Sequence, residues 1–193
     1  WLVAKLTDWA FNRQFMNALM TGRLFFWMPG AELVRERIPL PEGRPSLDYL
    51  GVNYYGRMQM ALSTKPPFFT LHEGPGTKSD LGWEIFPEGL YLTLKAVERY
   101  GLPVLISENG VADASDRLRP EFVRKHMESL ARARREGYPV IGYLHWSLTD
   151  NFEWAYGLKP RFGLIEIDYK TQERKPRPSF ETLKNIISRD GAL

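Results

Sequence analysis

Three short apolar runs, each followed by a segment with helical features, constrain the fold more strongly than anything else in the sequence. The runs span Tyr49–Tyr55, Val104–Ser107 and Val140–Trp146, and their length and apolar content predict β-strands. Strands that alternate with helices at this spacing form βα units whose strands pair in parallel. The sequence therefore predicts an α/β protein built around a parallel sheet.

The segments between these runs carry the start and stop signals of helices. Gly22, Gly101 and Gly137 each follow a segment of helical character, and a glycine commonly ends a helix in this way. We therefore predict helices over Leu2–Met20, Pro87–Tyr100, Arg119–Glu136 and Phe180–Ile187. The other segments are predicted as a proline-rich connector over Pro39–Pro45, a long polar loop containing Pro66, Pro67, Gly74, Pro75 and Gly76, and a short extra strand over Phe162–Tyr169.

Polar and aromatic residues collect where each predicted strand ends. Asn53 and Tyr55 close the first strand, Glu108 and Asn109 follow the second, and the segment His145–Glu153 follows the third. Active sites of parallel barrels and open sheets lie at the carboxyl ends of their strands. Because a buried carboxylate is costly unless it is paired or used, Glu108 is either a structural acid with a partner or a group that does chemistry.

These residues also have a purely structural interpretation. The aromatic side chains of Asn53–Tyr55 fit the ordinary preference of strands for aromatic residues. The segment His145–Gly157 fits an Asx-type turn whose aromatic rings cover the mouth of a barrel. The residues alone leave both interpretations open.

The composition excludes several classes of protein. The formal net charge of the 193 residues is +3 with scattered Lys and Arg, so we expect no nucleic-acid partner. The absence of cysteine excludes disulfides, and three histidines without paired ligand spacing predict no metal site. No apolar run approaches the ~20 residues of a membrane span, and no signal-peptide pattern is recognised. We therefore expect a cytoplasmic protein without membrane contact.

Several motifs together resemble the C-terminal part of family 1 glycoside hydrolases, the β-glucosidases and β-galactosidases. The motifs are GVNYYGR, GWEIFPEGL, LISENG and GYLHWSLTDNFEWAYGLKPRFGLIEIDY, followed by RKPRPS, and they span nearly the whole chain in family order. The resemblance implies the C-terminal part of a (β/α)8 TIM barrel, about strands six to eight with their helices. It also implies hydrolysis of terminal non-reducing β-D-glycosyl residues, in β-glucosides and also β-galactosides or β-fucosides, with retention and without a cofactor.

The resemblance assigns the nucleophile and its neighbours. Retaining hydrolysis uses two carboxyl groups ~5–5.5 Å apart, one as nucleophile and the other as acid and base. By resemblance, Glu108 of the SENG motif is the nucleophile and forms the covalent glycosyl-enzyme. Tyr55 is then the residue that orients this carboxylate, and Asn53 belongs to the same site.

The resemblance also assigns the residues that bind the sugar. Trp146 forms the floor beneath the non-reducing sugar, while Glu153 and Trp154 form hydrogen bonds with its hydroxyl groups. A carboxylate at Glu153 repels a phosphate group, because like charges at close range are unfavourable. The family assignment therefore favours unphosphorylated sugars as substrates.

One part of the family's site is missing from the sequence. The family's acid/base glutamate lies in an Asn-Glu-Pro motif on the fourth barrel strand, and no such tripeptide occurs here. We therefore expect residues 1–193 to be the C-terminal fragment of a single (β/α)8 domain. Its expected partners are the N-terminal portion of the same enzyme and a β-glycoside or oligosaccharide substrate.

Three strands cannot close a barrel, and their open edges are an aggregation liability, so we expect the chain alone to hydrolyse glycosides very poorly. One alternative is a non-catalytic sugar-binding relative, in which Glu108 is vestigial, or an inactive fragment. Another is a half-barrel that assembles with itself, although symmetric assembly of three-strand units does not easily make eight strands. 

Overall fold

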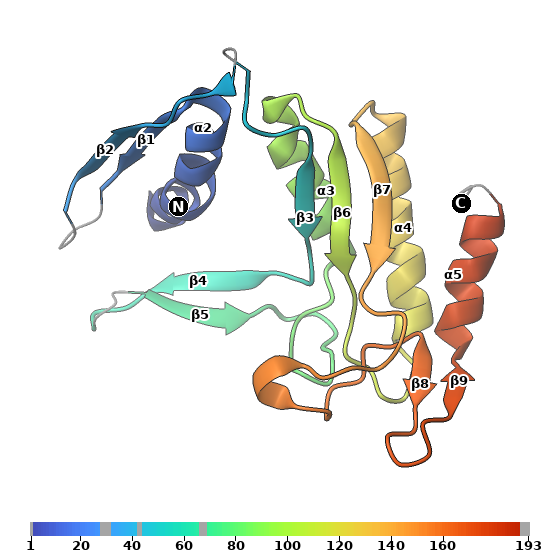
Figure 1. Ribbon diagram of the computed structural model, residues 1–193. Helices are drawn as coiled ribbons and strands as arrows, with labels where there is room; N and C mark the ends of the chain where they lie inside the picture. Colours follow the sequence, from blue (N-terminus) through green and yellow to red (C-terminus); the bar gives the residue numbers. More distant parts are fainter. Residues whose placement is uncertain (1, 28–31, 42–43, 66–68, 190–193) are drawn as a thin grey trace. The chain divides into compact units, whose positions relative to one another are not determined.

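A parallel sheet of three strands, in the order β3-β6-β7, carries most of the residues singled out above in the computed structural model (Figure 1). The strands are β3 (Leu50–Asn53), β6 (Val104–Asn109) and β7 (Val140–His145). β6 and β7 pair in parallel, and the arrows of all three strands point the same way in Figure 1. The structure describes residues 2–27, 32–41, 44–65 and 69–189. The predicted parallel sheet is confirmed.

Three helices follow the strands of this sheet. They are α3 (Pro87–Val97), α4 (Arg119–Arg135) and α5 (Pro178–Ser188), and each has a proline in its first turn, where the missing N–H is tolerated. α3 packs against α4, and α4 packs against α5 and β7. The apolar core formed by these elements contains Val111, Phe122, Val123, Met127 and Ile186. All three helices agree with the predicted segments to within a few residues.

The chain divides into two compact units, and the sheet belongs almost entirely to the second. This second unit comprises Gly51–Gln59 and His72–Leu193, and the first comprises Trp1–Leu50 and Met60–Leu71. The second unit also contains a small antiparallel pair, β8 (Ile165–Ile167) and β9 (Arg174–Pro176). The short extra strand predicted over Phe162–Tyr169 is therefore present but much shorter. Among the described residues, no helix is both long and apolar enough to cross a membrane.

The first unit begins with the predicted helix. It runs as α1 (Leu2–Asp8), a π-helical turn (Trp9–Arg13) and α2 (Gln14–Thr21), and the left-handed Gly22 ends it with φ of 68°. The chain then forms a hairpin of β1 (Arg23–Phe26) and β2 (Val34–Arg37), whose strands are antiparallel. This hairpin was not predicted, because its strands are short and lack a buried face. Part of the predicted connector Pro39–Pro45 lies outside the described residues.

The prediction of a long polar loop after β3 is wrong for much of this segment. The chain instead forms β4 (Met58–Leu62) and β5 (Phe69–Glu73), which pair as a two-stranded sheet. Most of their side chains are exposed, so the alternation that reveals a half-buried strand is weak. Gly74, Pro75 and Gly76 do lie in irregular structure after β5, whereas Pro66 and Pro67 lie outside the described residues.

Candidate active site

Glu108 lies inside the end of β6 rather than after it. The strand continues to Asn109, which corrects the expectation that it stops at Ser107. The pairing of β6 with β7 is irregular between Ile106 and Asn109, and such irregularities re-aim side chains at strand ends. Asn109 is fully buried, whereas the Glu108 side chain is only half-buried and remains accessible at the carboxyl end of the sheet.

Tyr55 donates a hydrogen bond of 2.7 Å from its hydroxyl to Oε2 of Glu108. The backbones are also joined, because the N–H of Tyr54 donates to the carbonyl oxygen of Glu108 at 2.8 Å. Burial, the hydrogen bond to Glu108 and the charges of Glu108 and Glu153 raise the pKa of the Tyr55 hydroxyl well above its usual value. Tyr55 therefore stays protonated at neutral pH and acts as a donor to the carboxylate.

Asn53 and Trp146 lie at the ends of the two strands that flank β6, Asn53 as the last residue of β3 and Trp146 just after β7. Asn53 ends β3, and its Oδ1 accepts a hydrogen bond of 2.8 Å from the hydroxyl of Ser107. Trp146 follows β7 directly, and its N–H donates to the carbonyl oxygen of Asn109 at 2.9 Å. The peptide bond between Trp146 and Ser147 is cis. All three strands thus bring a predicted site residue to the same end of the sheet.

Glu153 and Trp154 lie in the loop after β7. A 3-10 turn over Trp154–Tyr156 closes this loop locally, with the N–H of Glu153 donating to the carbonyl oxygen of Gly157 at 2.7 Å. Trp154 is 79% exposed, so its ring is free to contact a ligand. Oε2 of Glu153 is buried and, among the described residues, has no hydrogen-bond partner. A buried carboxylate oxygen without a donor indicates a missing partner.

The sequence did not predict the hydrogen-bond network that holds Asn109, the residue after Glu108. The Asn109 amide donates to the carbonyl oxygen of Tyr54 at 2.6 Å, and its Oδ1 accepts from the Tyr143 hydroxyl at 2.9 Å. Nδ1 of His145 lies 3.1 Å from that hydroxyl. Burial, Arg119 and His126 lower the pKa of His145 to about 3, so the ring is neutral. These contacts tie β6 to both neighbouring strands at the residue after Glu108.

A second polar cluster fixes the loop that carries Trp146 and Glu153. Asp150 in this loop is buried and accepts hydrogen bonds from Arg177 at 3.0 Å and from Arg161 at 3.1 Å. The backbone N–H groups of Gly163 and Ile167 donate to the same carboxylate at 2.9 and 3.3 Å, respectively. The carboxylate therefore joins the loop to β8 and to the start of α5.

A third cluster joins the loop after β6 to the same helix. Arg119 is completely buried, forms an ion pair with Asp116 and donates to the carbonyl oxygens of Asp113 and Arg161. Asp116 in turn accepts from the N–H and hydroxyl of Ser179 at 2.8 and 2.6 Å. The contacts of Arg119 with Arg161 and of Asp116 with Ser179 join positions 42 and 63 residues apart, so no local sequence signal reveals them.

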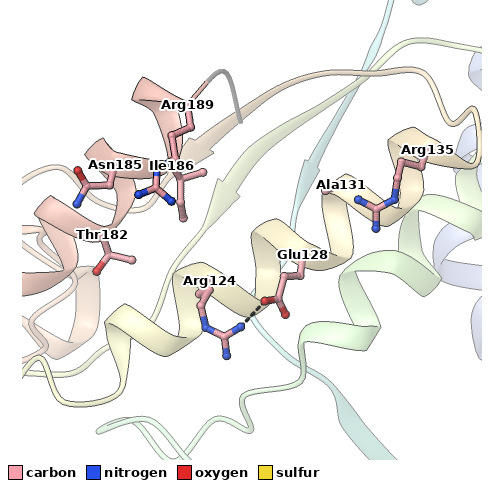
Figure 2. A pocket seen from close by; sticks show the side chains of 8 residues that line it. All are labelled: Arg124, Glu128, Ala131, Arg135, Thr182, Asn185, Ile186 and Arg189. Carbon is pink, nitrogen blue, oxygen red and sulfur yellow. Dashed lines mark hydrogen bonds and ion pairs between the residues drawn. The ribbon is translucent and has the colours of Figure 1, made fainter. Parts of the chain in front are cut away.

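Two hollows lie in very different places relative to these strand ends. A groove of about 660 Å³ lies between α4 and α5. Figure 2 shows two of its features, the pair of Arg124 with Glu128 on α4 and Arg189, which directly follows α5. Residues of α4 and α5, together with Arg189, line this groove, and none of the predicted site residues does. A smaller hollow of about 250 Å³ is lined by Tyr55, Arg57 and Trp83, among others, and therefore adjoins the candidate site.

The family model for "Glycosyl hydrolase family 1" matches residues 44–192 of the chain. A β-galactosidase of Pyrococcus woesei is 38% identical, over 92% of this chain and 38% of the relative. A 1,4-β-D-glucan glucohydrolase of Thermotoga neapolitana is 37% identical, over 83% of this chain and 40% of the relative. The chain thus spans about two fifths of the length of these relatives.

Solved structures show the same partial match. The β-glycosidase from Pyrococcus horikoshii superposes with a TM-score of 0.83 at 34% identity, covering 98% of this chain and 46% of the other. The β-glucosidase from Thermotoga maritima in complex with glucoimidazole superposes with a TM-score of 0.72 at 36% identity, covering 76% of this chain and 36% of the other. The three strands and their helices are therefore part of a TIM barrel.

Proposed function

The chain belongs to glycosyl hydrolase family 1, and from that premise we propose that it carries the nucleophile half of a retaining β-glycosidase site. The substrates are terminal non-reducing β-D-glycosyl residues, in β-glucosides and also β-galactosides or β-fucosides. Glu108 attacks the anomeric carbon, the bond to the leaving oxygen breaks, and a glycosyl ester on Glu108 forms. Water then hydrolyses this ester and releases the sugar with its configuration retained.

The hydrogen bond from Tyr55 to Glu108 carries this proposal. A nucleophilic carboxylate has to be aimed at the reacting carbon, and a donor at 2.7 Å from Oε2 fixes its direction. The position at the carboxyl end of a parallel strand is where barrel enzymes place their reacting groups.

The residues around Glu108 support recognition of an unphosphorylated sugar. Oε2 of Glu153 is buried without a donor, and a sugar hydroxyl would supply one. Trp154 exposes its ring beside this carboxylate, and Trp146 lies at the end of the neighbouring strand. Asn53 completes the set from β3. A flat aromatic surface next to clustered hydrogen-bonding groups suits a pyranose ring.

We assign the acid/base glutamate to a portion of the same enzyme that this chain does not contain. The sequence has no Asn-Glu-Pro tripeptide, and the chain spans about two fifths of its relatives. In the described residues, the outer edges of β3 and β7 carry no further strand of the sheet. Ile141 and Leu144 on β7 are 61% and 55% exposed, which suits strands and helices that cover them in a complete barrel.

Covalent labelling tests the proposed function. The probe is 2,4-dinitrophenyl 2-deoxy-2-fluoro-β-D-glucoside, whose good leaving group makes the first step nearly independent of acid assistance. Applied to the complete protein that carries this chain, it should add one fluoroglucosyl group to the peptide containing Glu108. Glu108→Gln should remain unlabelled, while the matched surface variant Glu128→Gln should label at the normal rate. Labelling elsewhere, or no labelling, would overturn the assignment.

A non-catalytic sugar-binding protein is the second candidate, favoured by the unpartnered oxygen of Glu153. In that case the tryptophans and Glu153 bind a sugar, while Glu108 does no chemistry. The same experiment separates the two functions when tryptophan fluorescence is recorded alongside the mass. Saturable quenching by glucose without a covalent adduct supports the binding protein, whereas an adduct on Glu108 supports the enzyme.

A further inference from the structure

Tyr55 is placed by the residues on either side of it. Tyr54 donates from its hydroxyl to the carbonyl oxygen of Phe86 at 2.5 Å. On the other side, Nε and Nη2 of Arg57 donate to the two carboxylate oxygens of Glu84 at 2.6 and 3.2 Å. The segment that carries Tyr55 is therefore fastened before and after this residue to one short segment, Glu84–Phe86.

Glu84 is the centre of this attachment. Its side chain is 2% exposed, and its carboxylate also accepts a hydrogen bond of 2.8 Å from the N–H of Gly76. The chain passes so close that a Cβ atom at Gly74 would lie 1.8 Å from Oε2 of Glu84, and one at Gly56 would lie 2.4 Å from its carbonyl oxygen. The segments around Arg57, Gly76 and Glu84 thus meet at one buried carboxylate.

The positive charge of Arg57 balances the negative charge of the Glu84 carboxylate. The hydrogen bond from Arg57 is the main reason that the pKa of Glu84 is lowered, with Gly76 contributing and burial opposing the shift. The Arg57 guanidinium also lies over the Phe86 ring, with its carbon 3.8 Å from the ring centre. The pair is therefore ionised and held on two sides, which makes its geometry well defined.

The residue next to Glu84 completes the contact with Tyr55. The ring of Trp83 meets the Tyr55 ring edge-on at 5.7 Å between centres, and Phe162 lies 6.2 Å from both rings. A shift of Glu84 would therefore move the surface on which the Tyr55 ring packs. The hydroxyl of Tyr55, at the far end of that ring, is the group that meets Glu108.

We propose that Glu84, through its ion pair with Arg57, is a positioning residue that holds Tyr55 in place against the nucleophile. The proposal rests on the proposed function, because it concerns how Glu108 is oriented for attack. The Glu84 side chain is only 2% exposed, so its role is to hold neighbouring protein groups rather than to touch a ligand. It acts by fixing the conformation of the segment Tyr54–Arg57. The Tyr55 hydroxyl is thereby held in hydrogen-bonding position to Oε2 of Glu108.

A double-mutant cycle on the complete protein tests this inference with the fluoroglucoside probe. The variants are Glu84→Gln, Tyr55→Phe and the combination, and the readouts are the labelling rate constant at saturation and the probe's apparent dissociation constant. Glu84→Gln keeps the size of the side chain but cannot accept both Arg57 hydrogen bonds. It should lower the saturating rate constant about tenfold while changing the dissociation constant less than about twofold.

The coupling between the two positions distinguishes positioning from mere stabilisation. If Glu84 acts through Tyr55, Glu84→Gln should lower the rate less than about twofold once Tyr55 is already Phe. Equal losses in both backgrounds would overturn the inference, as would a normal rate in Glu84→Gln. Wild-type protein that takes no label on Glu108 would instead overturn the proposed function itself, so the two failures are distinguishable.

Two further variants keep the test sound. Glu88→Gln is the matched control, because Glu88 is also a glutamate paired with an arginine, Arg132, but lies exposed on α3. It should label at the wild-type rate. Arg57→Lys tests the same link from the other side if Glu84→Gln reduces the folded fraction seen by circular dichroism. It keeps the charge, loses the two-point geometry and should show the same coupling to Tyr55.

Discussion

Arg177 donates two hydrogen bonds of 3.0 Å to Asp150, one to each carboxylate oxygen. Asp150 lies in the loop after β7 that carries Trp146 and Glu153, and Arg177 immediately precedes α5. Both side chains are almost completely buried, at 0% and 6% exposure. The pair therefore links the sugar-binding end of the proposed site to the packing of the last helix.

Removing the charge of Asp150 should destabilise the protein strongly. Asp150→Asn removes the buried counter-charge of Arg177 and leaves only the half-exposed Glu166 at 3.9 Å, and breaking a buried ion pair typically costs about 3–5 kcal/mol. The free energy of unfolding, measured in urea at pH 7, should fall by this order. Asp48→Asn, at an exposed aspartate, is the control and should change the free energy by less than about 0.5 kcal/mol. An unchanged stability of Asp150→Asn would contradict the prediction.

The same carboxylate should make the protein acid-labile. Burial opposes ionisation of Asp150, but the hydrogen bonds from Arg177 and from the Gly163 and Ile167 N–H groups outweigh it, so its pKa is lowered. A lowered folded-state pKa gives stability that is present above the unfolded value of about 3.9 and lost as the pH falls through the folded value. Urea titrations from pH 7 to pH 2 should show this loss. The slope should be smaller in Asp150→Asn.

His126 should also make the free energy of unfolding depend on pH, in a range above that of Asp150. Its ring is buried against Phe122 in α4, with Nδ1 2.8 Å from the Phe122 carbonyl oxygen, and burial lowers its pKa from 6.5 to about 4. Since the unfolded chain binds the proton more readily, stability is full above pH ~6.5 and falls toward pH ~4. In His126→Leu this part of the pH dependence should vanish. A ring proton resonance that titrates near pH ~6.5 in the folded protein would contradict the argument.

Runs of apolar residues located β6 and β7, and the glycine that follows α4 helped to locate this helix. The hairpins β1–β2 and β4–β5 escaped, since their side chains are mostly exposed and follow no such pattern. Glu108 was placed just beyond its strand, because the apolar run ends three residues before β6 does. Strand pairing there continues through the backbone, which the side-chain pattern does not reveal.

The sequence predicts that the site residues lie close together. It does not predict the ion pairs that fix the segments carrying them. Asn53, Glu108 and Trp146 lie at or next to the ends of neighbouring parallel strands, so topology alone brings them together. The ion pairs of Asp150 with Arg177 and of Glu84 with Arg57 join positions 27 residues apart in each case. Such pairs have no local signature, because the sequence does not distinguish a buried, paired acid or base from an exposed one on the same loop.

Tyr55→Phe should slow the glycosylation of Glu108 about ten- to a hundredfold, because the carboxylate loses the donor that orients it. The measurement is the labelling rate with the fluoroglucoside at saturating concentration. Tyr138→Phe is the control, since Tyr138 packs against Tyr91 away from the strand ends and should label normally. A normal rate in Tyr55→Phe would show that the hydrogen bond has no role in the reaction.

Glu153→Ala should weaken sugar binding rather than chemistry. A hydrogen bond to a charged group contributes about 1.5–3 kcal/mol, so glucoimidazole should bind roughly ten- to a hundredfold more weakly. Calorimetry on the complete protein measures this change. Glu166→Ala, at an exposed glutamate of β8, should bind as the wild type does. Equal affinity in Glu153→Ala would mean that its unpartnered oxygen does not meet the sugar.

The chain alone should show almost no turnover of p-nitrophenyl β-D-glucoside. It lacks an Asn-Glu-Pro motif for the acid/base glutamate, and Ile141 and Leu144 lie exposed on a strand at the sheet's edge. Co-expression with the N-terminal part of the Pyrococcus horikoshii β-glycosidase should restore turnover, because this chain superposes on 46% of that enzyme and the added part would supply the rest.

Restored turnover should disappear in Glu108→Gln. An intact-mass spectrum of each active sample settles which polypeptides are present, and ordinary turnover by the 22.4 kDa chain alone would overturn the two-part site.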